Sequence, residues 1–240
     1  MLIELIGVPG SGKSTVLRAL LPALRAQRVQ AHRADRLIAL ESTDPNAPRY
    51  LKRGPDRLAL YRSLQFRRSH PALLMHIEQD LAPGPADAFL FSWTTNLFQA
   101  AREHGPKDGF TFLDEGLVHR GASFHQTAEP QLFEHYLSLI PLPDVVVNLC
   151  PPPRLAYQRA VARRAHKTLP RAKVEAKFGD KLAFRERHRF IERGLDHLRG
   201  RGAVIWDIDT SEPLSSCTDA IVQRLLTMRE RALASATAAE

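Results

Sequence analysis

The stretch GVPGSGKST, from Gly7 to Thr15, directly follows the apolar run LIELI and has the spacing of a phosphate-binding loop. This P-loop pattern requires a strand before it and a helix after it, and the sequence predicts both. Glycines let several backbone N–H groups turn toward one point, and the following helix adds the positive end of its dipole. Lys13 would reach the β- and γ-phosphates of a nucleotide, and the Ser14 hydroxyl would bind Mg²⁺. The residues predicted to contact the nucleotide are Gly7, Pro9, Gly10, Ser11, Gly12, Lys13, Ser14 and Thr15.

A second candidate group is LDEG at 113–116, two carboxylates at the end of an apolar run of strand length. Parallel sheets place ligand chemistry at the carboxyl ends of their strands. Asp114 is predicted to hold Mg²⁺ through a water molecule, and Glu115 to polarise water or a substrate hydroxyl. The alternative is a pair of carboxylates that only solvates the strand end and caps a helix.

A third candidate is the basic segment RLAYQRAVARRAHK, in which Arg159 and Arg163 are four residues apart. On a helix, residues at this spacing share one face. Two guanidinium groups on one face suit a transferring phosphoryl group, whose transition state gathers negative charge. Taken alone, the same pattern also fits a solvated surface helix.

The remaining sequence predicts the elements that must position these groups. Apolar runs at 2–7, 29–33, 109–116, 143–150 and 202–209 have strand length and alternate with segments of helical periodicity. This alternation predicts an α/β fold with a mainly parallel sheet covered on both faces. Pro22 interrupts the first helical segment and predicts a kink or an early end. Phe89, Trp93 and Leu97 fall at i, i+4 and i+8 of a later helix and predict one buried stripe.

Composition limits the classes of function. The 240 residues favour one α/β domain over the whole chain, 1–240, and the net charge of +8 comes largely from arginines between 154 and 201. Because no aromatic track accompanies these arginines, we favour a small polyanionic ligand over nucleic acid. The sequence has no apolar run of membrane-spanning length and no signal-peptide pattern, which predicts a cytoplasmic protein without a membrane partner. Neither the two cysteines nor the histidines, His119, His125 and His166 included, have metal-site spacing.

The chain resembles the thymidylate kinase-like branch of P-loop nucleoside and nucleotide kinases. The resemblance is carried by GVPGSGKST, by LDEG, by LCPPPRLAYQRAVARR and by the order of the last long helix and strand. It implies a doubly wound fold around a five-stranded parallel sheet, with ATP and Mg²⁺ as ligands. It also implies an arginine-bearing lid at about 152–175 and an adenine pocket bordered by residues 207–210, including Asp209. Relatives are often homodimers, so a homodimer is possible.

The acceptor side departs from this resemblance. Thymidylate kinases carry an Asp-Arg pair after the third strand, whose arginine grips the phosphate of the acceptor, whereas this chain has Asp114-Glu115. Arg120 either compensates or is a surface charge. After the second strand, Asp35 is a candidate base, and Arg33 or Arg36 a candidate acceptor contact, each with a plain loop charge as the alternative. Phe89 and Trp93 either line an acceptor pocket or pack in the core.

The sequence thus predicts an ATP- and Mg²⁺-dependent phosphotransferase acting on a small hydroxyl- or phosphate-bearing acceptor. Lys13, Arg159 and Arg163 would act on the transferred group, Ser14 and Asp114 on Mg²⁺, and Glu115 or Asp35 on the acceptor. The alternatives are a true thymidylate or other nucleoside monophosphate kinase, and an ATPase switch that works with a protein partner.

Overall fold

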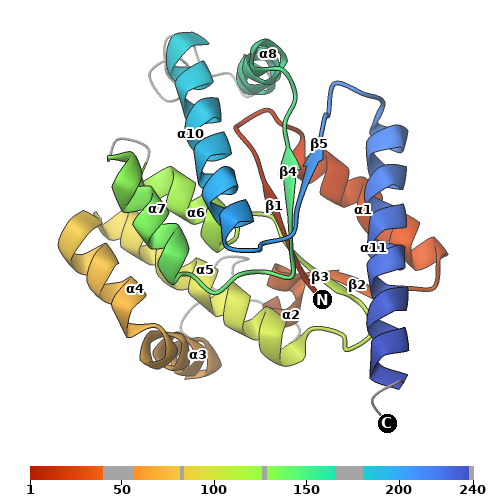
Figure 1. Cartoon of the computed structure of the whole chain (residues 1–240), viewed down its shortest axis with the longest axis horizontal. Helices are drawn as coiled ribbons and strands as arrows, with labels where there is room; N and C mark the ends of the chain where they lie inside the picture. The colour runs from red at the N-terminus through yellow and green to blue at the C-terminus, as the bar shows by residue number, and fades with distance from the viewer. Residues whose placement is uncertain (40–56, 82–83, 126–128, 166–180, 238–240) are drawn as a thin grey trace.

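A five-stranded sheet in which every pairing is parallel forms the centre of the computed structural model (Figure 1). Its strand order is β2-β3-β1-β4-β5, so the predicted fold class is confirmed. The structure describes residues 1–39, 57–81, 84–125, 129–165 and 181–237. The strands are β1 (Leu2–Ile6), β2 (Ala31–Arg33), β3 (Phe110–Leu113), β4 (Val145–Leu149) and β5 (Ile205–Ile208).

Both faces of the sheet are apolar because helices cover both. Side chains alternate along β1: Ile3 and Leu5 belong to one hydrophobic cluster, and Leu2 and Ile6 belong to the other. Every residue of β1, β3 and β4 is buried, as expected of strands covered on two sides. The charged residue in these three strands is Glu4, a carboxylate on the same face as Leu2 and Ile6, and the neutral polar ones are Thr111 and Asn148.

Helices fall into two groups, one on each face of the sheet (Figure 1). The first group is α1 and α11, which pack on each other and on the cluster that contains Ile3 and Leu5. The second group covers the face of Leu2, Ile6 and Glu4. The helices are α1 (Lys13–Ala26), α2 (Ala34–Ala39), α3 (Arg57–Ser69), α4 (Pro71–His76), the π-helical turn η1 (Ile77–Leu81), α5 (Pro85–His104), α6 (Leu117–Phe124), α7 (Pro130–Leu139), α8 (Pro153–Ala165), α10 (Lys181–Gly200) and α11 (Leu214–Thr237).

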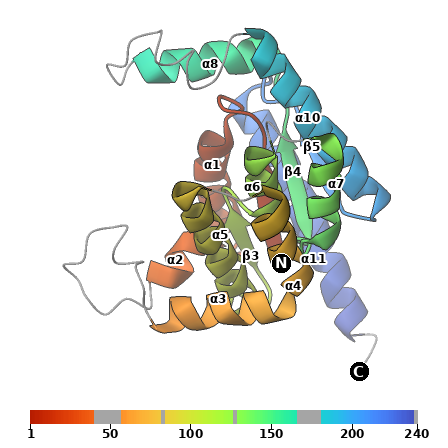
Figure 2. The same ribbon diagram turned by 90° about the vertical axis from the view of Figure 1, so that its left-hand side faces the viewer.

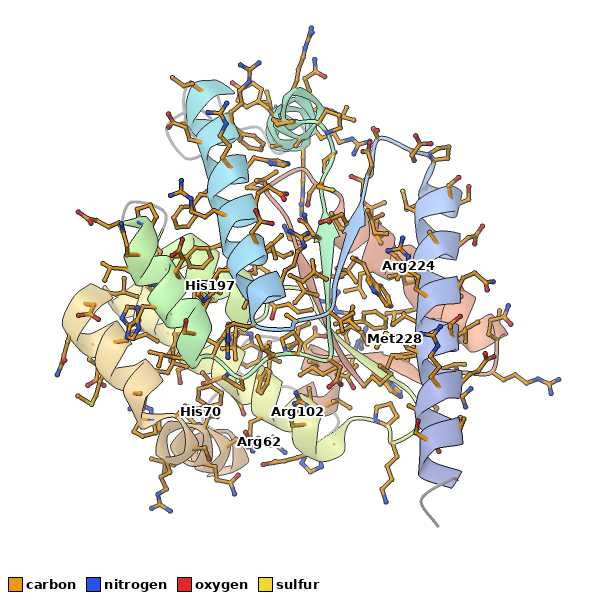
Figure 3. All side chains as sticks on the ribbon, viewed as in Figure 1. Arg62, His70, Arg102, His197, Arg224 and Met228 are labelled. Carbon is orange, nitrogen blue, oxygen red and sulfur yellow. The ribbon has the colours of Figure 1, made fainter. Side chains whose placement is uncertain are left out.

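Arginine side chains link the outer helices α3 and α11 to neighbouring elements (Figure 3). Arg62 of α3, only 2% exposed, donates to Glu103 of α5 over 3.0 Å and contacts His104 Nε2 at 2.6 Å. On the other side, the Arg224 guanidinium of α11 lies over the Trp206 ring at 5.8 Å. None of the described helices is long and apolar enough to cross a membrane.

Two local predictions are wrong in part. Pro22 lies inside α1, so the predicted early end does not occur, because Leu17, Leu20 and Leu24 bury one apolar face on both sides of the proline. The alternative, a kink at Pro22, stays a prediction. Phe89 is 65% exposed, so the predicted stripe of Phe89, Trp93 and Leu97 is not uniformly buried. The buried face of α5 is instead rotated toward Phe91, Thr94, Thr95 and Phe98. The predicted turn-rich loop at 43–55 and the first part of the predicted helix at 174–199 lie outside the described residues, except for its portion in α10. Residues 166–175 of the predicted lid, His166 among them, lie outside the described residues.

Candidate active site

The loop between β1 and α1 has the backbone geometry of a phosphate cradle. Gly10 and Gly12 have φ of +82° and +95°, a region that side chains with a Cβ rarely adopt. At Gly10 a Cβ would also overlap the carbonyl oxygen of Ala156 in α8, so the loop and this helix are in direct contact. Figure 2 shows α8 lying across the carboxyl end of the sheet, above the loop.

Lys13 is the first residue of α1, directly after this loop, and its ammonium group points back to the start of the loop. Its Nζ donates a 2.6 Å hydrogen bond to the Gly7 carbonyl oxygen. Burial lowers the pKa of Lys13 to about 8, and the charges of Glu115 and Asp114 oppose that shift. An anionic ligand would favour the charged form of Lys13 further, because an opposite charge within a few ångströms stabilises it.

Ser14 and Asp114 come from different elements and meet at the end of β3. The Ser14 hydroxyl lies 3.5 Å from Asp114 Oδ2, while Asp114 Oδ1 is buried and has no hydrogen-bond partner among the residues that the structure describes. Burial raises the pKa of Asp114 above its ordinary value. A hydroxyl and a carboxylate beside a phosphate cradle are the donor set that Mg²⁺ takes in nucleotide sites, and the orphaned Oδ1 gives it a further oxygen. The residues present therefore fit the predicted ion.

A cavity of about 710 Å³ joins the loop to α8. Arg163 lines it without a hydrogen bond or ion pair in the part of the chain that the structure describes, and Arg159 donates to the Thr210 carbonyl oxygen over 3.0 Å. The residues lining this cavity are Pro9, Gly10, Ser11, Gly12, Lys13, Ser14, Thr15, Arg18, Asp114, Glu115, His119, Arg159, Ala160 and Arg163. Six of the predicted catalytic and metal-binding residues are thus brought together, and Asp35 is not among them.

Two further side chains near this cavity, those of His119 and Arg187, have no functional role predicted from the sequence, although His119 lies close to LDEG in the chain. His119 of α6 lines the cavity, and burial together with the charges of Lys13 and Arg120 holds its pKa well below the ordinary value. Arg187 of α10 is near enough to contribute to the lowered pKa values of Lys13 and His119. Neither belongs to a recognisable motif, and only their places in the fold bring them to the loop.

A second cavity, of about 230 Å³, opens beside the first and shares Asp114 and Glu115 with it. Its apolar wall consists of Leu90, Trp93, Leu97, Phe112 and Leu113. Trp93 lines this cavity and also packs against the hydrophobic core, so its role in an acceptor pocket stays a prediction, while Phe89 does not line the cavity.

Both arginines of the second cavity are paired with carboxylates. Arg33 Nε lies 3.0 Å from Asp35 Oδ1, and the Arg120 guanidinium donates to Glu115 Oε2 over 3.0 Å. Arg120 is 6% exposed, so it is not a surface charge, and its Nε also reaches the Thr94 hydroxyl at 3.4 Å. Arg33 and Asp35 line the cavity, whereas Arg36 does not.

A third cavity, of about 250 Å³, lies where the resemblance implies an adenine pocket. Thr210, Glu212, Leu214 and Cys217 line it together with Gly12, Thr15, Val16 and Arg159. Thr210 is tied to the loop, since its hydroxyl donates to the Ser11 carbonyl oxygen over 2.7 Å. Asp209 does not line this cavity, and its carboxylate accepts a hydrogen bond from the Ser211 amide.

A buried carboxylate, Glu4 of β1, lies beneath the site. It is 0% exposed, and burial raises its pKa to about 7, although backbone amides of α6 and the charge of Arg120 favour its ionised form. Burial raises the pKa of Tyr136 well above its ordinary value, and the negative charge of Glu4 adds to this shift.

Glu4 should make the stability of the protein fall with rising pH. A carboxyl group whose pKa is raised in the folded state stabilises that state below the unfolded value of 4.5 and loses this contribution as the pH rises through about 7. In urea unfolding, the free energy of unfolding of Glu4→Gln relative to wild type should increase by about 2–3 kcal/mol between pH 5 and pH 8. A difference that stays constant across this range would show that Glu4 does not titrate there.

Comparison with known proteins shows which solved structures share this fold. No protein-family model and no curated protein matches the sequence. The structure is similar to a deoxyadenosine kinase from M. mycoides with bound dATP, with 12% sequence identity and a TM-score of 0.52 over 94% of this chain and 99% of that chain. It is also similar to that kinase with the products dCMP and a flexible dCDP bound, with 12% identity and a TM-score of 0.50 over 95% and 100% of the two chains. The chain therefore has the fold of P-loop kinases, and the thymidylate kinase-like branch stays a prediction.

Proposed function

We propose that this protein transfers the γ-phosphoryl group of Mg²⁺-bound ATP to a hydroxyl group of a small, uncharged acceptor. The observation that carries the proposal is the pair of neighbouring cavities that share Asp114 and Glu115. One cavity is lined by the phosphate-binding loop and arginines, and the other by apolar side chains and paired charges. Two such pockets meeting at two carboxylates suit the transfer of a group between two bound molecules.

On the donor side, the loop amides and Lys13 would hold the β- and γ-phosphates, and Ser14 with Asp114 would hold Mg²⁺. The ion would neutralise charge on the phosphates as the transferred group departs. Arg159 and Arg163 project from α8 at the opposite wall of the cavity and would stabilise the negative charge of the transition state. Because α8 contacts the loop at Gly10, we propose that it belongs to the predicted lid at about 152–175 and helps to exclude water.

On the acceptor side, Glu115 suits the role of orienting the hydroxyl better than Asp35. Glu115 lines both cavities, so its carboxylate lies at the boundary that the phosphoryl group must cross. Of these two cavities, Asp35 lines only the second, and its carboxylate forms an ion pair with Arg33. Asp35 would instead bind another polar group of the acceptor.

The charges of the second cavity argue against a phosphate-bearing acceptor. It presents three carboxylates, those of Asp35, Asp114 and Glu115, against the guanidinium groups of Arg33 and Arg120. Both guanidinium groups are already paired with carboxylates. A monophosphate entering here would be repelled by three carboxylates and attracted by only two guanidinium groups, whose charge the carboxylates already offset, whereas an uncharged molecule could pack on Trp93 without that repulsion. A switch ATPase would have no need of this second pocket.

A screen for ADP release tests the proposal. Nucleosides form the first set of acceptors, because the similar solved structures are of a deoxyadenosine kinase, followed by other hydroxylated metabolites and the matching monophosphates. We expect at least one uncharged hydroxyl compound to raise ADP release tenfold or more over the rate without acceptor, and the monophosphates to have no such effect.

One control variant accompanies the screen, and two other outcomes would contradict the proposal. A Trp93→Ala variant should raise the acceptor KM about tenfold while leaving the KM for ATP unchanged, because it removes an aromatic surface from the second cavity only. Stimulation by monophosphates alone would identify a nucleoside monophosphate kinase instead. A slow ATPase rate that no small molecule changes would favour the switch.

A further inference from the structure

Helix α6 begins at a residue that cannot cap it. Gly116 occupies the N-cap position and has no side chain to accept a hydrogen bond from the first-turn amides. The first amides of a helix lack partners within the helix and need an acceptor from elsewhere. The position at which α6 begins affects the site, because His119 and Arg120 lie in its first turn. Asp114 and Glu115 lie just before the N-cap residue.

Glu4 supplies the missing acceptor from the central strand. Its Oε1 accepts a 2.7 Å hydrogen bond from the His119 amide, 115 positions further along the chain. The amides of Leu117 and Val118 also stabilise the ionised carboxylate. A negative charge at this end of a helix is further favoured by the helix dipole.

The absence of a side chain at residue 116 follows from the presence of Glu4. A Cβ built on Gly116 would overlap Oε2, the carboxyl carbon and Cγ of Glu4. The backbone of Gly116 is extended, with φ of −90°, a conformation open to any residue. Glycine is therefore required here by the space that Glu4 occupies and not by the backbone angles.

We propose that Glu4 is a positioning residue for the acceptor carboxylate. By capping α6 it fixes where the helix begins, and the Arg120 amide bonds to the Gly116 carbonyl oxygen in the first turn over 2.9 Å. The Arg120 guanidinium then holds Glu115 at 3.0 Å on the boundary of the two cavities. One side chain of the strand that leads into the phosphate-binding loop thus sets the geometry of the acceptor side. The catalytic part of this inference rests on the proposed phosphoryl transfer.

The proposal can be tested by moving the cap from Glu4 to residue 116. Glu4→Ala removes the acceptor, and Gly116→Ser alone brings a Cβ against Glu4. In the double variant Glu4→Ala/Gly116→Ser the space is open, and the serine hydroxyl can cap its own helix. The readouts are amide hydrogen exchange at residues 117–119, the Arg120 Nε resonance in NMR spectra, the acceptor kcat and KM, and the Kd for ATP.

In Glu4→Ala we expect the α6 amide hydrogens to exchange at least tenfold faster than in wild type. We also expect the Arg120 Nε resonance to shift and kcat to fall at least tenfold. The Kd for ATP should change less than threefold, because the loop itself is untouched. Gly116→Ser should also be impaired, and the double variant should return exchange and kcat to within about threefold of wild type. Should Glu4→Ala fail to fold, Glu4→Gln, which keeps one accepting oxygen, should show exchange raised severalfold.

Unchanged α6 exchange in both Glu4 variants would overturn the proposal, and so would a double variant no better than Glu4→Ala. Recovery of exchange without recovery of the Arg120 resonance would overturn it too, because the cap would then not position Arg120. Exchange and NMR need no turnover, so they remain decisive for Glu4 even if the wild-type protein phosphorylates no acceptor and the proposed function fails.

Discussion

Replacing Lys13 with alanine is expected to lower kcat for phosphoryl transfer by roughly 10³-fold. Lys13 is the ammonium group in the phosphate-binding loop, and its Nζ lies at hydrogen-bond distance from the Gly7 carbonyl oxygen. Removing one preorganised donor that faces developing negative charge lowers the rate by roughly 10²–10³-fold in comparable sites, and Lys13 also binds the phosphates of the ground state. Steady-state kinetics with saturating acceptor should show the loss in kcat together with a raised KM for ATP.

The fold should survive this substitution. Within the described parts of the chain, the Lys13 side chain donates only to a carbonyl oxygen of its own loop, and burial already disfavours its charged form. The thermal midpoint of Lys13→Ala should therefore lie within a few degrees of wild type. Lys107→Ala, an exposed lysine in the turn before β3, is the matched control and should leave kcat unchanged. A Lys13→Ala protein with wild-type turnover would remove the basis for assigning ATP to this loop.

The fold was predictable because the signals that specify it are local. Continuous apolar runs such as 143–150 indicate strands buried on two faces, and β4 indeed spans Val145–Leu149 with every residue buried. The glycine loop between an apolar run and a helical segment fixes the first βα unit in the same way. Strand order is not local: the resemblance implied a doubly wound five-stranded sheet but no order, and the structure gives β2-β3-β1-β4-β5.

The acceptor side was predictable only in part, because its partners are distant in sequence. From the sequence alone, Arg120 fits a surface position as well as a buried one. Only the structure shows that Thr94 and Glu115 lie beside it. Glu4 sits in an apolar strand, where a single carboxylate carries no indication of the helix N-terminus it will meet. The periodicity of α5 misplaced Phe89 because three residues at i, i+4 and i+8 do not define which side of the helix faces the core.

The nucleotide-base side shows a smaller error of the same kind. Residues 207–210 were predicted to border an adenine pocket, and Thr210 does line the third cavity. Asp209, chosen within that range, turns back to the Ser211 amide instead. Alternation along an extended segment means that a shift of one residue exchanges the side chain facing the cavity for the one facing away.

Replacing Asp114 with asparagine is expected to lower kcat by roughly 10²–10³-fold and to raise the Mg²⁺ concentration needed for half-maximal activity. Asparagine keeps the shape of the side chain and removes the charge that attracts a divalent cation. It leaves a neutral amide beside Ser14, 3.5 Å away in the native site, and beside the position of the ion. Titration of activity with MgCl₂ at saturating ATP measures both effects, with the exposed Asp219→Asn as the control.

Comparison of Asp114→Asn with Glu115→Gln separates the two cavities. If Asp114 holds the ion, its loss should slow both the transfer to acceptor and the hydrolysis of ATP without acceptor, because both reactions need the same Mg²⁺–phosphate complex. If Glu115 orients the acceptor, Glu115→Gln should slow the transfer while leaving hydrolysis and the Mg²⁺ titration near wild type. Adjacent residues in the chain would then act on different substrates, as expected where a strand end lies between two pockets. Equal effects of the two substitutions on hydrolysis would contradict this division and place Glu115 with the metal.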